Sequence, residues 1–118
     1  MSQPVLLNAM PLEIEFRARK RFGGWQDAHH AIGVTIGQYE LSILTSIRLR
    51  QNQPVQLRIG HEDLALTDIL ATVDQVEQRG ADFVYHLQFD LSQVDDAGKA
   101  GADMLLTILR ARLKPGRS

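Results

Sequence analysis

The sequence predicts a mainly β protein, with about six antiparallel strands in a small barrel or sandwich and one amphipathic helix near the C-terminus. Three observations support this fold class. Apolar and polar residues alternate in five separate segments, short clusters of turn-forming residues divide them, and helical spacing appears only in the last part of the chain. Short turns join antiparallel neighbours, so a parallel sheet with crossover helices is disfavoured.

Five segments have the period-two pattern of strands with one buried face, and we expect their apolar residues to face one core. These segments are residues 11–16, 31–37, 39–47, 54–60 and 83–90. The alternating residues are Leu12, Ile14 and Phe16; Ile32, Val34 and Ile36; Leu41 and Ile43; Val55, Leu57 and Ile59; and Phe83, Tyr85, Leu87 and Phe89. In the last segment His86 falls on the opposite face, where we expect it to meet solvent.

Residues 64–78 are predicted to form the sixth strand, which is long and bent. Their apolar positions change phase, from Leu64 and Leu66 to Ile69, Ala71 and Val73 and then to Val76. A strand changes phase where an extra residue forms a bulge. Turn-forming residues at 37–38, 51–54, 60–63 and 78–82 mark the ends of the strands.

Residues 92–114 change to the helical period and end at Pro115-Gly116. Ser92 or Asp95 can cap the start of this helix. We expect its apolar stripe to be buried against an open mouth or edge of the barrel. The stripe consists of Val94, Ala97, Met104, Leu105, Ile108, Leu109 and Leu113.

Length and composition indicate one ordinary globular domain, because the chain has 118 residues, 44% of them hydrophobic and 23% charged. We assign residues 11–118 to this domain. Residues 1–10 are set apart as an N-terminal arm, and the sequence leaves open whether the arm is ordered, disordered or completes a neighbouring subunit.

The formal charge of −1 gives no overall field toward nucleic acid or an anionic membrane, so any attraction to anions must be local. The chain has no cysteine, which excludes disulfides and thiolate metal sites. Its start resembles neither a signal peptide nor a membrane span. We therefore expect a soluble cytoplasmic protein that binds no nucleic acid and does not insert into a membrane.

The order of the segments from Pro11 to Leu113 resembles that of a PilZ domain. Leu41-Ser42-Ile43, Leu49, Gln53 and Val55-Gln56-Leu57 are similar to the family's Gly-Leu-x-Ile strand and the segment after it, and Tyr85, Leu87 and Phe89 to its late Tyr-x-x-Gly-Val-x-Phe strand. The resemblance implies a six-stranded antiparallel barrel with a C-terminal helix. It also implies a bacterial regulatory protein, and many members of the family bind cyclic di-GMP.

The nucleotide motifs of that family are only half present. Arg17-Ala-Arg-Lys-Arg21 satisfies the pattern Arg-x-x-x-Arg, and guanidinium groups can grip phosphate and stack on guanine. The resemblance therefore implies Arg17, Arg19 and Arg21 as the residues that would hold cyclic di-GMP. The second motif, Asp/Asn-x-Ser-x-x-Gly, is replaced by Thr35, Gly37 and Glu40, and the Glu40 carboxylate would oppose phosphates.

Each other candidate site has a plain structural alternative. The cations at 17–21 can be a solvated, mobile surface loop, and Trp25 can either seat against a partner or plug the barrel end. The adjacent His29 and His30 point to opposite sides of a strand, so we expect no metal site there.

The sequence contains few candidate catalytic residues, and their spacing does not support a catalytic site. His61 with Glu62 and Asp63 suits a polar turn better than an acid/base pair. Ser42 and Ser46 have no histidine or aspartate at an informative spacing, so we expect no enzyme.

Two functions stay open on this basis. The first is a non-enzymatic regulatory adaptor without tight cyclic di-GMP binding, which docks to a cytoplasmic protein of a motility, pilus, secretion or related signalling system. Trp25 is the candidate partner-binding residue. The second is a cyclic di-GMP receptor that uses Arg17, Arg19 and Arg21. The sequence does not decide the oligomeric state.

Overall fold

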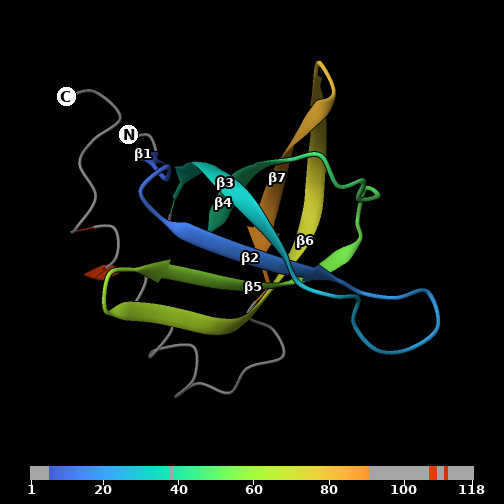
Figure 1. The fold of residues 1–118 in the computed structure, drawn as a ribbon, viewed down its shortest axis with the longest axis horizontal. Coiled ribbons are helices and arrows are strands. Elements are labelled where there is room, and N and C mark those ends of the chain that lie inside the picture. Colours follow the sequence, from blue (N-terminus) through green and yellow to red (C-terminus); the bar gives the residue numbers. More distant parts are fainter. Residues whose placement is uncertain (1–5, 38, 91–106, 109–110, 112–118) are drawn as a thin grey trace.

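The structure is a computed structural model of the chain, and it describes residues 6–37, 39–90, 107, 108 and 111. Seven strands are present in these residues (Figure 1). They are β1 (Leu7–Asn8), β2 (Glu13–Ala18), β3 (His29–Ile36), β4 (Glu40–Thr45), β5 (Pro54–His61), β6 (Leu64–Arg79) and β7 (Asp82–Phe89).

Six of the strands close into an antiparallel barrel. The strand order is β1-β3-β2-β5-β6-β7-β4, and an additional pairing of β3 with β4 joins the two sides of the sheet. This closure confirms the predicted mainly β class and selects the barrel over the sandwich. Strand β1 pairs with β3 at Ile36 and Thr35, beyond the part of β3 that pairs with β2.

The core is built from apolar residues of six strands, β2 to β7, and the Tyr85 side chain links it to a loop. The Tyr85 hydroxyl donates to the Ile47 carbonyl and accepts from the Leu49 amide, both at 2.8 Å. The loop between β4 and β5 is therefore held to β7. The fully buried large side chains are Phe16, Ile14, Ile36, Leu41, Ile43, Val55, Leu57, Ile59, Val73, Tyr85 and Leu87.

Strand β3 departs from the predicted alternation. We expected Ile32, Val34 and Ile36 to share the buried face, but Ile32 is 55% exposed while Ile36 is fully buried. The reason is a register shift against β4 between Gly33 and Thr35, which changes the phase of the strand. Ile32 therefore points outward, and that part of the prediction is wrong.

The long bent strand at 64–78 is confirmed as β6. Its pairing with β5 shifts between Ile69 and Leu66, where Asp68 has a left-handed φ of 59°. A second shift, at Asp74, occurs where β6 pairs with β7. Beyond this second bulge β6 and β7 continue as a hairpin that projects from the barrel (Figure 1).

Part of the predicted N-terminal arm belongs to the barrel. Leu7 and Asn8 form β1, and Ala9 is fully buried. The Ala9 amide donates to the Val34 carbonyl at 3.1 Å, and a β-carbon on Gly33 would collide with the Ala9 carbonyl group. Close contact between these two segments therefore depends on the glycine.

The predicted helix at 92–114 lies outside the described residues, apart from the helical Thr107, Ile108 and Ala111, and it remains a prediction. Ile108 is 39% exposed, and the burial of the rest of the predicted stripe lies outside the described residues. In the described part of the chain, no helix has the length and apolar character needed to cross a membrane.

Candidate functional site

The arginine-rich stretch after β2 is the first candidate site. Arg17 lies within β2, while Arg19, Lys20, Arg21 and Trp25 belong to the loop between β2 and β3. The four cationic side chains are exposed, and Trp25 is half-buried. Figure 1 shows that the loop projects beyond the barrel at the end where β2 finishes.

Backbone hydrogen bonds fix the base of this loop. The Gln26 amide donates to the Ala18 carbonyl at 2.8 Å, and Arg19 forms a bridge with Trp25. The Arg19 amide donates to the Pro54 carbonyl at 3.0 Å, which ties the loop to the start of β5. The sequence suggested a mobile loop, whereas the base of the loop is bonded to the barrel.

Gln53 connects this loop to the neighbouring loop between β4 and β5. Its side chain is buried, and the amide Nε2 donates to the Arg19 carbonyl at 3.3 Å. Its Oε1 accepts from the Arg50 amide at 2.8 Å. One buried amide side chain therefore satisfies a backbone group in each loop and holds the two loops together.

The tip of the β2–β3 loop is a tight turn that presents an aromatic side chain. The Lys20 amide donates to the Gly24 carbonyl at 3.0 Å. Gly23 and Gly24 follow each other with left-handed φ values of 71° and 73°, which glycine adopts without steric cost. Phe22 is 89% exposed at this turn. The sequence analysis missed Phe22, although its position between cations and a Gly-Gly pair was visible.

These two loops form what we call the basic end, which consists of Arg19, Lys20, Arg21, Arg48 and Arg50. Residues 19–27 and 46–53 contain these five cations and one carboxylate, in a chain whose formal charge is −1. The Arg48 guanidinium lies 5.6 Å from the centroid of the Phe83 ring, in a cation–π contact. The basic end is therefore a local concentration of positive charge.

Arg17 faces a different surface. It lines a hollow of about 220 Å³ on the outer face of β2, β5 and β6, together with Glu15, Arg58, Thr67 and Asp68. The side chains of Arg17 and Arg58 make no ion pair with any other residue that the structure describes. Arg17 and Arg21 thus belong to two separate surfaces, a strand face and a loop tip.

The residues in place of the second nucleotide motif lie at the other end of the barrel. Phe16 pairs with His29, and β3 then runs back past Ile32 to Thr35. Six residues of strand separate the position beside Phe16 from Thr35, which is a distance of about 20 Å. The Gly37 amide donates to the Glu40 carbonyl at 2.8 Å, which closes a tight turn. The two motif regions therefore do not face a common ligand.

An apolar row crosses the outside of the barrel on three strands. Ile32 pairs with Leu44, and Leu44 pairs with Val84. Val84 is only 1% exposed although it does not belong to the interior core. We call these three residues the outer stripe. A hollow of about 280 Å³ lies beside Ile32 and Leu44, and it is lined also by His30, Thr45, Ser46 and Asp82.

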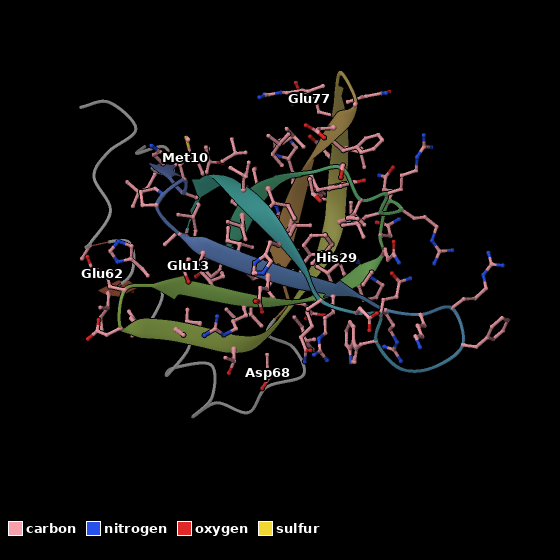
Figure 2. All side chains as sticks on the ribbon, in the orientation of Figure 1. Met10, Glu13, His29, Glu62, Asp68 and Glu77 are labelled. Carbon is pink, nitrogen blue, oxygen red and sulfur yellow. The ribbon has the colours of Figure 1, made fainter. Side chains whose placement is uncertain are left out.

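The next row on this face brings together polar residues that are far apart in the sequence. Ser42 Oγ lies 2.7 Å from His86 Nδ1, and His86 Nε2 lies 3.9 Å from Glu77 Oε2. The pairing of β7 with both β4 and β6 creates this chain, with Glu77 on the β6 side (Figure 2), so no spacing could have indicated the contact between Ser42 and His86. His86 is partly exposed on the outer face, which confirms that prediction.

This serine–histidine–glutamate chain does not have the geometry of a catalytic triad. The contact between His86 and Glu77 is too long for a hydrogen bond. Both β4 and β7 are paired on both sides, so their amides serve the barrel and none is free to stabilise an oxyanion. We interpret the chain as a cross-strand polar contact that shields the outer stripe.

The remaining histidines are placed separately. The His29 ring lies 5.8 Å from that of Phe16, while His30 Nε2 lies 3.6 Å from Glu15 Oε1 on the outer face. They point to opposite sides, as predicted. His61 ends β5, and Glu62 and Asp63 form the turn after it. Within the described residues, no three His, Cys, Asp or Glu side chains form a group that could hold a metal.

Comparison with known proteins identifies no family for this chain. The sequence matches no model of a protein family, and it matches no curated protein. The candidate surfaces are therefore the basic end, the hollow beside Arg17 and the outer stripe, each defined by the geometry of this chain alone.

Proposed function

We propose that the protein is a non-enzymatic regulatory adaptor of the PilZ type, which docks to a cytoplasmic protein through the outer stripe and does not bind cyclic di-GMP tightly. The observation that supports this most is the exposed Ile32 beside Leu44, because the strand bulge turns an apolar residue away from the core. The partner would belong to a bacterial motility, pilus, secretion or related signalling system, as the resemblance implies.

Closure of the barrel favours a docking face over an edge. A partner cannot add a strand where β3 and β4 already pair, so it must use side chains on the outer surface. Within the outer stripe, the exposed Ile32 and the half-buried Leu44 offer an apolar centre, and His30, Ser46 and Asp82 supply polar groups around it. An apolar centre with a polar rim is the usual arrangement of a protein interface. The small size of the patch favours a transient contact.

Photo-crosslinking in the native bacterium tests the docking face. A photoreactive phenylalanine at Ile32 should give one discrete adduct with another protein, and Leu44→Asp should abolish that adduct. The matched control is the same probe at Met10, which is also exposed but lies outside the stripe. Identical adducts from both positions, or none from Ile32, would contradict the proposal.

A cyclic di-GMP receptor is the second candidate, and one observation favours it. Arg17 and Arg58 line the hollow on the outer face without ion-pair partners among the described residues, so two guanidinium groups are free for phosphate. Arg19 and Arg21 would then have to approach from the neighbouring loop. The separation of the two motif regions argues against tight binding, and the Glu15 and Asp68 carboxylates in the same hollow would oppose phosphates.

Calorimetric titration with cyclic di-GMP at physiological salt separates the two candidates. The adaptor proposal expects no heat of binding up to about 100 μM ligand, which corresponds to a binding free energy weaker than about −5.5 kcal/mol. Saturable binding at micromolar ligand that Arg17→Gln abolishes would establish the receptor instead. GMP serves as the control ligand for nonspecific phosphate binding.

A further inference from the structure

We propose that the basic end docks the protein on an anionic lipid surface, with Phe22 in the interfacial region and the surrounding cations on lipid phosphates. This is surface binding by a loop and not a membrane span. It involves a surface separate from the outer stripe, so it goes beyond the proposed adaptor function.

The shape of the loop suits insertion of one side chain at an interface. Phe22 is 89% exposed, and the turn that carries it is closed by the hydrogen bond from Lys20 to Gly24. The base of the loop is fixed to β5 through Arg19 and Gln53. Because the base is already ordered, docking has less conformational entropy to overcome than a free segment would. Aromatic side chains are favoured at the boundary between headgroups and acyl chains.

The charges of the basic end match a phosphate-bearing surface. Arg19, Lys20 and Arg21 flank the exposed ring, and Arg50 is linked to Arg19 through the Gln53 side chain. The side chains of these cations have no ion-pair partners elsewhere in the described structure. Each cation near an anionic bilayer adds attraction, and an exposed apolar ring adds a second, independent contribution.

The arrangement fits a lipid surface better than a single-stranded nucleic acid. Nucleic acids of that kind bind along grooves in which successive exposed aromatic rings stack on the bases. Here only Phe22 is fully exposed, since Trp25 is half-buried and the Phe83 ring is partly buried, with Arg48 over it. One projecting ring directly after three cations, with two further cations on the neighbouring loop, fits a broad anionic plane.

Vesicle flotation with the full chain tests the proposal. The probes are vesicles of phosphatidylcholine alone and of phosphatidylcholine with 40% phosphatidylglycerol, at low and physiological salt. We expect binding to the anionic vesicles alone, weakened by salt. Phe22→Ser should reduce the partition coefficient roughly tenfold, and Phe22→Trp should restore it. Replacing Arg21 or Arg50 by glutamine should reduce it about fivefold each.

Matched controls are Met10→Ser and Arg79→Gln, an exposed apolar residue and an exposed cation outside the basic end, and both should leave partitioning unchanged. No binding to anionic vesicles overturns the proposal, as does equal binding to both vesicles or binding insensitive to Phe22→Ser. Release of the protein from anionic vesicles by an equimolar oligonucleotide would also overturn the proposal.

This outcome is independent of the adaptor function. The Leu44→Asp variant should bind anionic vesicles as the unmodified protein does, because it alters only the outer stripe. The crosslink from Ile32 should conversely survive Phe22→Ser in detergent-solubilised cells. Each proposal can therefore fail without the other.

Discussion

The two ends of the barrel differ in how the chain turns from one strand to the next. At the basic end β2 and β3 are joined by residues 19–28, which project with exposed cations and Phe22. At the other end β3 and β4 are joined by a tight turn closed by Gly37 and Glu40, against which Leu6 packs. The basic end therefore has a long projecting loop, whereas a short turn in contact with the N-terminal segment closes the other end.

The comparison shows that a binding motif depends on strand register as well as on residue spacing. Arg17 and Arg21 satisfy the Arg-x-x-x-Arg pattern in the sequence. Because β2 and β3 are antiparallel, the segment of Thr35 to Glu40 is carried to the opposite end. Two halves of a site that are close along the chain are then separated by about 20 Å of strand.

The largest expected loss of stability is at the contact between β3 and the N-terminal segment. Gly33→Ala should lower the free energy of unfolding by about 2–3 kcal/mol, because the new methyl group would push Ala9 and β1 away from β3. Urea denaturation measures this loss. The control is Gly24→Ala at the basic end, where space is open and only the left-handed φ costs about 1 kcal/mol. Equal losses at both positions would mean that the two ends do not differ in packing.

A somewhat smaller effect is expected where the two loops of the basic end meet. Gln53→Ala should cost about 1–3 kcal/mol, because the Arg50 amide and the Arg19 carbonyl lose their partner. Gln53→Glu keeps the acceptor for Arg50 but turns a buried carboxylate oxygen toward the Arg19 carbonyl, so it should also lower stability while the Arg50 contact persists. Amide hydrogen exchange at Arg50 checks the mechanism, since protection should fall in the alanine variant and persist in the glutamate variant.

Substitution at the contact between Ser42 and His86, on the outer face of β4 and β7, should lower stability less. Ser42→Ala removes the hydrogen bond to His86 Nδ1 and should cost about 1 kcal/mol. Ser46→Ala, an exposed serine at the start of the next loop, should leave the unfolding midpoint unchanged. A stabilised Ser42→Ala variant would show that the chain from Ser42 to His86 carries strain instead of support.

The smallest change in stability is expected from substitution of the two arginines of the Arg-x-x-x-Arg pattern. Arg17→Ala combined with Arg21→Ala should change the free energy of unfolding by less than about 0.5 kcal/mol, because exposed unpaired charges contribute little. Calorimetry with cyclic di-GMP should remain silent before and after the change. Guanine-selective binding in the unmodified chain that this double substitution removes would restore the arginines as a receptor site.

Much of the fold could be predicted because the barrel follows local chemistry. Alternation identified β2, β5 and β7, and the phase slip identified the bulges of β6. The error at Ile32 has a physical cause, since a bulge at Gly33 to Thr35 depends on how β3 meets β4 and β1, which alternation alone does not encode.

The candidate sites were less predictable. The cations at 17–21 were visible in the sequence, but their division between a strand face and a loop tip was not. The Gln53 side chain links Arg50 to Arg19, and Ser42 meets His86 only through strand pairing. Contacts between residues more than 30 positions apart require the tertiary fold, which spacing rules cannot supply.

The closing pairs of the barrel also have a consequence for how the chain reaches its native state. Leu41 on β4 pairs with Leu87 on β7, so this pairing joins parts of the sequence that are separated by β5 and β6. Such a high contact order slows folding, and barrels of this kind typically need milliseconds to seconds. Until then the free edges of β4 and β7 can pair with other chains. Rapid dilution from denaturant at high protein concentration should therefore favour aggregation, and slow dilution should favour the monomeric barrel.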